Sequence, residues 1–225
     1  MKRIISLIIL LTTKYLSLLF YKFEVNWPKE TIKWEEIKLI IFLNHTSLFE
    51  FLYLGILPNH FLNKLSKRMV APGANKTLDR PIVGLFFKLF SPGMISITRK
   101  RDDSWDNFLD AIYDDSIILI APEGRMMREN GLDLDGNKMT VKSGVADILV
   151  GLTNGQMAIA YSGGLHHVQI PGESFPKLFK TLKLSLETLD INQYKKNFLG
   201  DPNSETWKKA VVLDLQNRLE TKTPK

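Results

Sequence analysis

Beyond Ile37, short apolar runs alternate with stretches whose apolar residues recur at helical spacing. The runs predict strands at Lys38–Leu43, Arg68–Ala71, Met94–Thr98, Ile117–Ala121, Met157–Tyr161 and Leu182–Thr188. The helically spaced stretches predict helices at Ser47–Leu57, Pro81–Phe90, Trp105–Tyr113, Ser143–Leu152 and Glu205–Leu219, the last after a capping serine in "PNSE". This alternation predicts a single α/β domain over residues 24–225, with a mostly parallel central sheet flanked by helices.

The first 23 residues follow a different pattern. Two positive charges precede a long apolar run, and on a helix Ser6, Thr13, Ser17 and Lys14 form a narrow polar stripe beside a broad apolar side. Such a helix is typical of segments that lie in the plane of one membrane leaflet. A spanning helix with a snorkelling Lys14 and a buried core helix are the alternatives. No small-residue cleavage site follows, so we expect residues 1–23 to be a membrane-associated helix that keeps the protein on the cytoplasmic side.

The composition narrows the classes of partner. The formal net charge is +6 and the pI about 9.3, which suits an anionic membrane, a phosphorylated substrate or nucleic acid, or simply a solvated basic surface. The lysines are scattered and no aromatic–basic motif occurs, so we expect no nucleic-acid partner. The chain has no cysteine, which excludes disulfides, thiolate zinc sites and a cysteine nucleophile.

Three chemically distinct residues follow predicted strands. His45 comes after the first strand, Arg99 after "MISIT" and Glu123 after "IILIAP". Each alone has an ordinary explanation as a surface or turn residue. In mostly parallel sheets, however, functional residues gather where strands end in loops. The repeated placement therefore predicts one site that combines a base, a cation and a carboxylate.

Glu50 follows His45 by five positions. If a helix starts at Thr46 or Ser47, its side chains lean toward the N-terminus, and Glu50 reaches the imidazole. A carboxylate on one ring nitrogen fixes the tautomer and makes the other nitrogen a better general base for a hydroxyl. The sequence contains no Gly-x-Ser-x-Gly nucleophile motif, so we expect direct transfer to the hydroxyl of a bound acceptor.

The blocks "NHTSLFE", "GMISITR" and "APEGR", followed by "KSGVADIL", occur in this order between about Lys38 and Val150. Together they resemble the glycerolipid acyltransferases related to lysophosphatidate acyltransferase. The resemblance makes His45 and Glu50 the catalytic residues, with glutamate where the family usually has aspartate. It assigns substrate binding to Asn44, Arg99, Glu123, Gly124 and Arg125, with Arg99 on the acceptor phosphate and Arg128 as a further candidate.

The resemblance also implies the substrates. A fatty acyl group would pass from acyl-CoA or acyl-carrier protein to a lysophospholipid, with 1-acylglycerol 3-phosphate as the favoured acceptor, in phospholipid synthesis at the membrane. No cofactor and no metal are expected, because the thioester is already activated. Two blocks depart from the family pattern: "PEGR" lacks a threonine, and "AIAYSGGLHHVQIPGE" replaces the fourth block, so that His166 and His167 are read as loop residues. The alternative function is a non-catalytic lipid-binding protein on the same fold.

Overall fold

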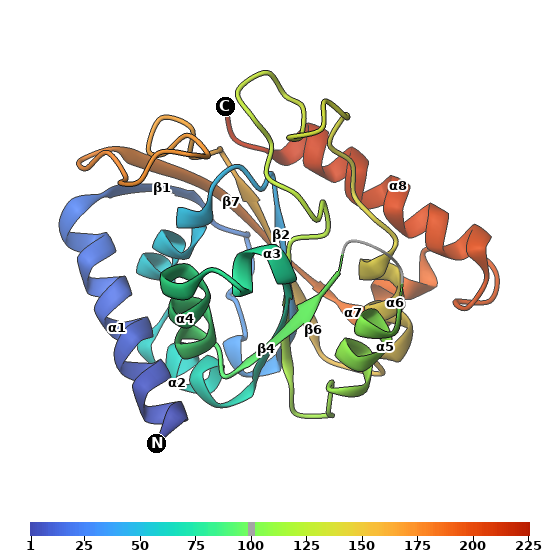
Figure 1. Cartoon of the computed structure of the whole chain (residues 1–225). Helices are drawn as coiled ribbons and strands as arrows, with labels where there is room; N and C mark the ends of the chain where they lie inside the picture. Colours follow the sequence, from blue (N-terminus) through green and yellow to red (C-terminus); the bar gives the residue numbers. More distant parts are fainter. Residues whose placement is uncertain (99–101) are drawn as a thin grey trace. The chain divides into compact units, whose positions relative to one another are not determined.

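The computed structural model describes residues 1–98 and 102–225 (Figure 1). The chain forms two compact units. The first comprises Met1–Leu19 and Leu52–Ile120, and the second comprises Phe20–Phe51 and Ala121–Lys225. Each unit therefore joins segments that are far apart in the sequence.

Four strands of the second unit lie in the order β1-β7-β6-β2. They are β1 (Lys22–Asn26), β2 (Ile37–Leu43), β6 (Gln156–Ser162) and β7 (Thr181–Asp190). The pairs β1–β7 and β2–β6 are parallel, whereas β6 and β7 are antiparallel. Every second side chain of β2 is fully buried, which fixes the register of this strand and the point where it ends.

The helical elements of the second unit are η1 (Trp34–Glu36), α6 (Gly144–Gly151), α7 (Ile191–Lys196) and α8 (Glu205–Lys222). The side chain of Ser204 accepts a hydrogen bond from the Trp207 N–H at 3.2 Å, so the predicted capping serine of α8 is confirmed. One face of α8 is buried through Trp207, Val211 and Leu215.

The described residues of the first unit form three strands in the order β5-β3-β4. They are β3 (Met69–Ala74), β4 (Gly93–Ile97) and β5 (Ile117–Ile120), and both pairs are parallel. Its helices, besides the N-terminal one, are α2 (Asn59–Arg68), α3 (Asn75–Leu78), α4 (Pro81–Phe90) and α5 (Asp103–Asp110). A Cβ on Gly93 would lie 2.2 Å from the backbone oxygen of Met69, so only glycine lets β4 approach β3 this closely.

The α/β class and the mostly parallel pairing are confirmed. Ten of the predicted elements form, with ends shifted by at most three residues, and the eleventh, Ser47–Leu57, is instead a 3₁₀ helix. The elements that were missed are β1, η1, α2, α3 and α7. Part of β1 lies in a polar stretch for which the sequence pattern predicted no strand. It is a short edge strand without fully buried residues, and the strand it pairs with, β7, lies far away in the sequence.

The N-terminal helix α1 (Lys2–Phe20) forms as predicted, and its polar stripe faces the protein. The Ser6 hydroxyl donates to the backbone oxygen of Phe90 at 2.7 Å. The Lys14 ammonium donates to the backbone oxygen of Leu57 at 2.6 Å and to Oδ1 of Asn59 at 2.8 Å. Through these hydrogen bonds, the polar side of α1 packs against other helices and loops of the first unit.

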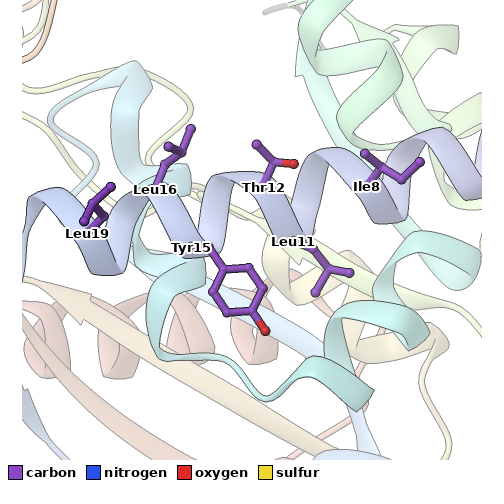
Figure 2. Close-up of a pocket in the computed structure, with 6 residues that line it drawn as sticks. All are labelled: Ile8, Leu11, Thr12, Tyr15, Leu16 and Leu19. Atoms are coloured by element: carbon purple, nitrogen blue, oxygen red, sulfur yellow. The ribbon is translucent and has the colours of Figure 1, made fainter.

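The opposite side of α1 is apolar and exposed. Ile4, Ile8, Tyr15, Leu16, Leu18 and Leu19 are 48–68% exposed, whereas Ser6 and Ser17 are fully buried. Figure 2 shows the shallow pocket on this helix, lined by Ile8, Leu11, Thr12, Tyr15, Leu16 and Leu19. A helix on the surface of a water-soluble protein buries its apolar side and exposes its polar side, whereas α1 does the opposite. This argues against the alternative of a buried core helix. By length and composition alone, α1 is also apolar enough to cross a membrane.

Candidate active site

The loop after β2 starts with Asn44, whose backbone lies in the left-handed region at φ 65°. Asparagine tolerates this conformation better than most residues. Its side-chain Nδ2 donates at 2.7 Å to the backbone oxygen of Ser162, which ends β6. Asn44, predicted to bind substrate, therefore ties together the ends of two paired strands and sets the direction in which the chain continues to His45.

The contact expected between His45 and Glu50 is present. One Glu50 oxygen contacts Nδ1 of His45, and the other accepts the backbone N–H groups of Thr46 at 2.6 Å and Ser47 at 3.3 Å. Glu50 belongs to η2 (Leu48–Ile56), the 3₁₀ helix that replaces the predicted Ser47–Leu57 helix. Glu50 itself thus closes the tight turn at the start of η2, together with the Ser47 hydroxyl, which accepts from the Phe49 N–H at 3.2 Å.

The environment of His45 suits a base. In the neutral imidazole, a proton on Nδ1 that is donated to the Glu50 carboxylate leaves the lone pair on Nε2. The side chain of His45 is 21% exposed and that of Glu50 11%. Burial alone lowers the pKa of His45, but the charge and hydrogen bond of Glu50 and the charge of Glu123 outweigh it, so the pKa lies above its ordinary value of 6.5.

Glu123 supports the same loop through the backbone. It is 2% exposed, and its Oε2 accepts the backbone N–H of His45 at 2.8 Å. Burial raises the pKa of Glu123 to about 7, against the opposing effect of that hydrogen bond. The next residue, Gly124, has φ 69°, as expected for a glycine in this turn. Glu123 thus holds the backbone of His45 in a fixed position.

Arg125 forms ion pairs with two carboxylates of the loop that follows it, Asp133 and Asp135. Its Nη1 lies 3.0 Å from Oδ2 of Asp133 and also contacts Oδ2 of Asp135. The other oxygen of Asp133 accepts the N–H groups of Asn137 at 2.8 Å and Asp135 at 2.9 Å, which lowers the pKa of Asp133. The positive charge of Arg125, predicted to bind substrate, is therefore already balanced within the protein.

The chain after Arg125 bonds back to the His45 loop. The Met127 N–H donates to the backbone oxygen of His45 at 2.8 Å, and Nε2 of His166 donates to the backbone oxygen of Met127 at 2.7 Å. Nη1 of Arg128 donates to the backbone oxygen of Pro171 at 2.6 Å. Its Nε is buried, and no acceptor for it occurs among residues 1–98 and 102–225. Arg128 thus has one buried donor that no acceptor in the described part of the chain satisfies.

A second set of contacts to the His45 loop comes from the segment that departs from the expected fourth block. The Ser47 hydroxyl donates to Oε1 of Gln169 at 2.6 Å, and the Leu165 N–H donates to the Thr46 hydroxyl at 2.8 Å. All four groups are buried. The sequence offered no signal for Gln169 beyond that departure, because its partner lies 122 residues earlier.

Two further expectations concerned a phosphate-binding arginine and the absence of a metal. Arg99, expected to grip the acceptor phosphate, lies outside the described residues. In the described part of the chain, no group of three or more histidine, aspartate and glutamate residues is arranged to hold a metal ion.

The sequence model of the Acyltransferase family matches residues 24–161, more than half of the chain. The fold is similar to that of the 1-acyl-sn-glycerophosphate (LPA) acyltransferase PlsC from Thermotoga maritima, with a TM-score of 0.55 and 15% sequence identity. This similarity covers 96% of the present chain and 81% of that protein, so it extends through both units, as expected for one α/β domain. No functionally curated protein matches the sequence.

Proposed function

Because this chain belongs to the acyltransferase family, we propose that it moves a fatty acyl group from a thioester to the free hydroxyl of a lysophospholipid. The contact between His45 Nδ1 and Glu50 carries this proposal, since it supplies a general base whose free nitrogen is Nε2. We favour 1-acylglycerol 3-phosphate as the acceptor, by analogy with the Thermotoga maritima enzyme of similar fold. The donor is acyl-CoA or acyl-carrier protein.

In the proposed reaction, Nε2 of His45 takes the proton from the acceptor hydroxyl as its oxygen attacks the thioester carbonyl. The tetrahedral intermediate then collapses, the carbon–sulfur bond breaks, and the thiolate takes the proton from His45. Glu50 holds the imidazole and stabilises its positive form during these steps. General-base catalysis of this kind contributes about 10²- to 10⁴-fold, and the remainder comes from positioning the two substrates. No cofactor takes part in this scheme.

The acceptor phosphate needs cations. Arg99 is our first candidate, as the resemblance implies. Arg125 would have to exchange Asp133 and Asp135 for the phosphate, whereas Arg128 offers a buried Nε that lacks an acceptor within the described chain. A guanidinium suits this role because it binds phosphate through two parallel hydrogen bonds. Gly124, which carries no side chain, lets an acceptor approach the backbone beside Glu123.

We further propose that α1 lies in the plane of one leaflet, with the protein facing the cytoplasm. The bonds of Ser6 and Lys14 to the first unit support this orientation, because a helix that crossed the bilayer would have to break them. The exposed apolar side of α1 would then face lipid. The absence of cysteine fits a reducing compartment, and the net charge of +6 suits an anionic bilayer.

The test uses the full-length protein with acyl-CoA or acyl-carrier protein and a panel of lysolipids, with each product identified by its mass. We expect His45→Ala to abolish product formation without loss of folding. His60→Ala, at an exposed histidine of α2, is the matched control and should retain activity. A wild type that binds lysolipids but acylates none with either donor would instead be a non-catalytic lipid-binding protein.

A further inference from the structure

The segment from Phe175 to Lys180, here called the interface loop, exposes three large apolar side chains in the second unit. Phe175 is 83% exposed, Phe179 74% and Leu178 45%. None of the contacts described above that hold His45 involves these side chains. Isolated exposed apolar residues are normal, but three within five positions form a patch that calls for an apolar partner.

Basic residues accompany this patch. Between Ser174 and Leu186 the chain carries Lys177, Lys180 and Lys183 and no acidic residue. Lys177 lies 3.7 Å from the carboxylate of Glu173, a loose and exposed ion pair that contributes little. Aromatic side chains interleaved with lysines are typical of segments at the boundary between water and an anionic membrane.

The backbone conformation at Phe179 and its hydrogen bonds keep this side chain exposed. Phe179 has φ 58°, an uncommon conformation for a bulky residue. Its N–H donates to the backbone oxygen of Phe20 at 2.8 Å, and its ring meets the Phe20 ring edge to face with the centroids 5.9 Å apart. The Lys22 N–H donates to the backbone oxygen of Lys180 at 3.1 Å. The exposure of Phe179 is thus set by specific bonds, and strained backbone held in this way is often found at functional sites.

We infer that the interface loop inserts Phe175, Leu178 and Phe179 into the headgroup region of an anionic phospholipid bilayer, with the lysines on the lipid phosphates. An acidic protein surface would match the lysines but would leave the protruding side chains without an apolar medium, whereas a bilayer interface satisfies both. The inference rests on the proposed membrane association and extends it to the unit that contains His45.

The interface loop begins two residues after Glu173, whose backbone is bonded by Gln169 of the segment that contacts the His45 loop. The Oε1 of Gln169 accepts the Ser47 hydroxyl, and its Nε2 donates to the backbone oxygens of Ile170 at 2.6 Å and Glu173 at 2.8 Å. Insertion therefore takes place only a few residues from a group that positions the catalytic loop. Acceptors embedded in a bilayer should consequently gain more from an intact interface loop than acceptors dispersed in water.

The absence of cysteine allows a single spin label to be placed anywhere on the full-length chain. Phe175→Cys reports on the interface loop, and Leu213→Cys, at a 70% exposed residue of α8, is the matched control. The vesicles contain phosphatidylglycerol and phosphatidylcholine, or phosphatidylcholine alone. With the anionic vesicles we expect the label at 175 to gain access to oxygen and lose access to a water-soluble relaxant, while the label at 213 does not change.

Two unlabelled variants measure how much the apolar and the basic side chains of the interface loop each contribute to vesicle binding. Phe175→Ser should weaken vesicle binding by about 10-fold. The double change Lys177→Gln and Lys180→Gln should weaken binding by about 30-fold, on the anionic vesicles only. Unchanged accessibility at 175, or wild-type binding by both variants, would overturn the inference. Shielding of the label by acyl-carrier protein but not by vesicles would overturn it as well and assign the loop to a protein partner. None of these readouts needs acyl transfer, so an inactive wild type would refute the proposed function alone.

Discussion

Replacing Glu50 by glutamine tests the proposed catalytic pair, His45 and Glu50, most directly. In Glu50→Gln the amide oxygen could still accept the N–H groups of Thr46 and Ser47, so the turn should persist. The amide NH₂ group would then face Nδ1 of His45, which must become the acceptor. The ring proton would move to Nε2, and the lone pair needed for catalysis would be lost from that nitrogen.

The size of the effect follows from the charge that is removed. A hydrogen bond to a charged group contributes about 1.5–3 kcal/mol, which corresponds to roughly one to two pKa units. Because Glu50 raises the pKa of His45 and the neutral imidazole is the active base, the acid limb of kcat/KM against pH should move to lower pH by that amount. The plateau value of kcat/KM above the acid limb should fall by about 10²- to 10⁴-fold, the usual contribution of general-base catalysis.

The assay compares pH–rate profiles of the wild type, Glu50→Gln and Glu50→Asp. The aspartate variant keeps the negative charge and introduces the residue that the family usually has at this position, so it should retain activity. The raised pKa of His45 stabilises the folded wild type below the ordinary value of 6.5, and this contribution is lost as pH rises through the folded-state pKa. The gap in Tm between wild type and Glu50→Gln should therefore narrow at high pH. A Glu50→Gln enzyme with the wild-type plateau and acid limb would refute the orienting role of Glu50.

Four further predictions concern the rest of the molecule. Arg99→Ala should raise KM for a phosphorylated acceptor by about 10- to 150-fold in steady-state kinetics, while a change in donor KM alone would reassign Arg99 to the donor. Burial raises the pKa of Glu123 from 4.5 to about 7, so this carboxyl stabilises the fold below pH 4.5 and loses that contribution as pH rises through about 7. In urea unfolding, Glu123→Gln should lack this pH dependence of stability, and equal dependence in wild type and variant would contradict the raised pKa. Gln169→Leu removes the partner of Ser47 and should lower kcat with little change in KM, whereas an effect on KM alone would place Gln169 at the substrate. In protease protection, an N-terminal tag should be digested from the cytoplasmic side; protection on the far side would mean that α1 spans the bilayer.

Features that depend on residues close together in the sequence could be predicted from the sequence alone. The alternation of apolar runs and helically spaced stretches indicated the α/β class, because strands and helices repeat with their own short periods. The spacing of His45 and Glu50 indicated their contact for a related reason: a single turn suffices to bring them together. Likewise, Ser204 was recognisable as the cap of α8, since it bonds three residues ahead.

Other features depended on contacts between distant segments. The polar stripe of α1 was visible in the sequence, but only folding showed that Ser6 and Lys14 turn toward the protein. The pairing of Ser47 with Gln169, which lie 122 positions apart, carries no periodic signal. Periodicity reports the conformation of neighbouring residues, whereas burial and hydrogen-bond partners are decided by which distant segments pack together. The sequence by itself therefore determined the class of fold and the contact between His45 and Glu50. The tertiary structure decided which distant groups hold that contact and which apolar side chains remain exposed.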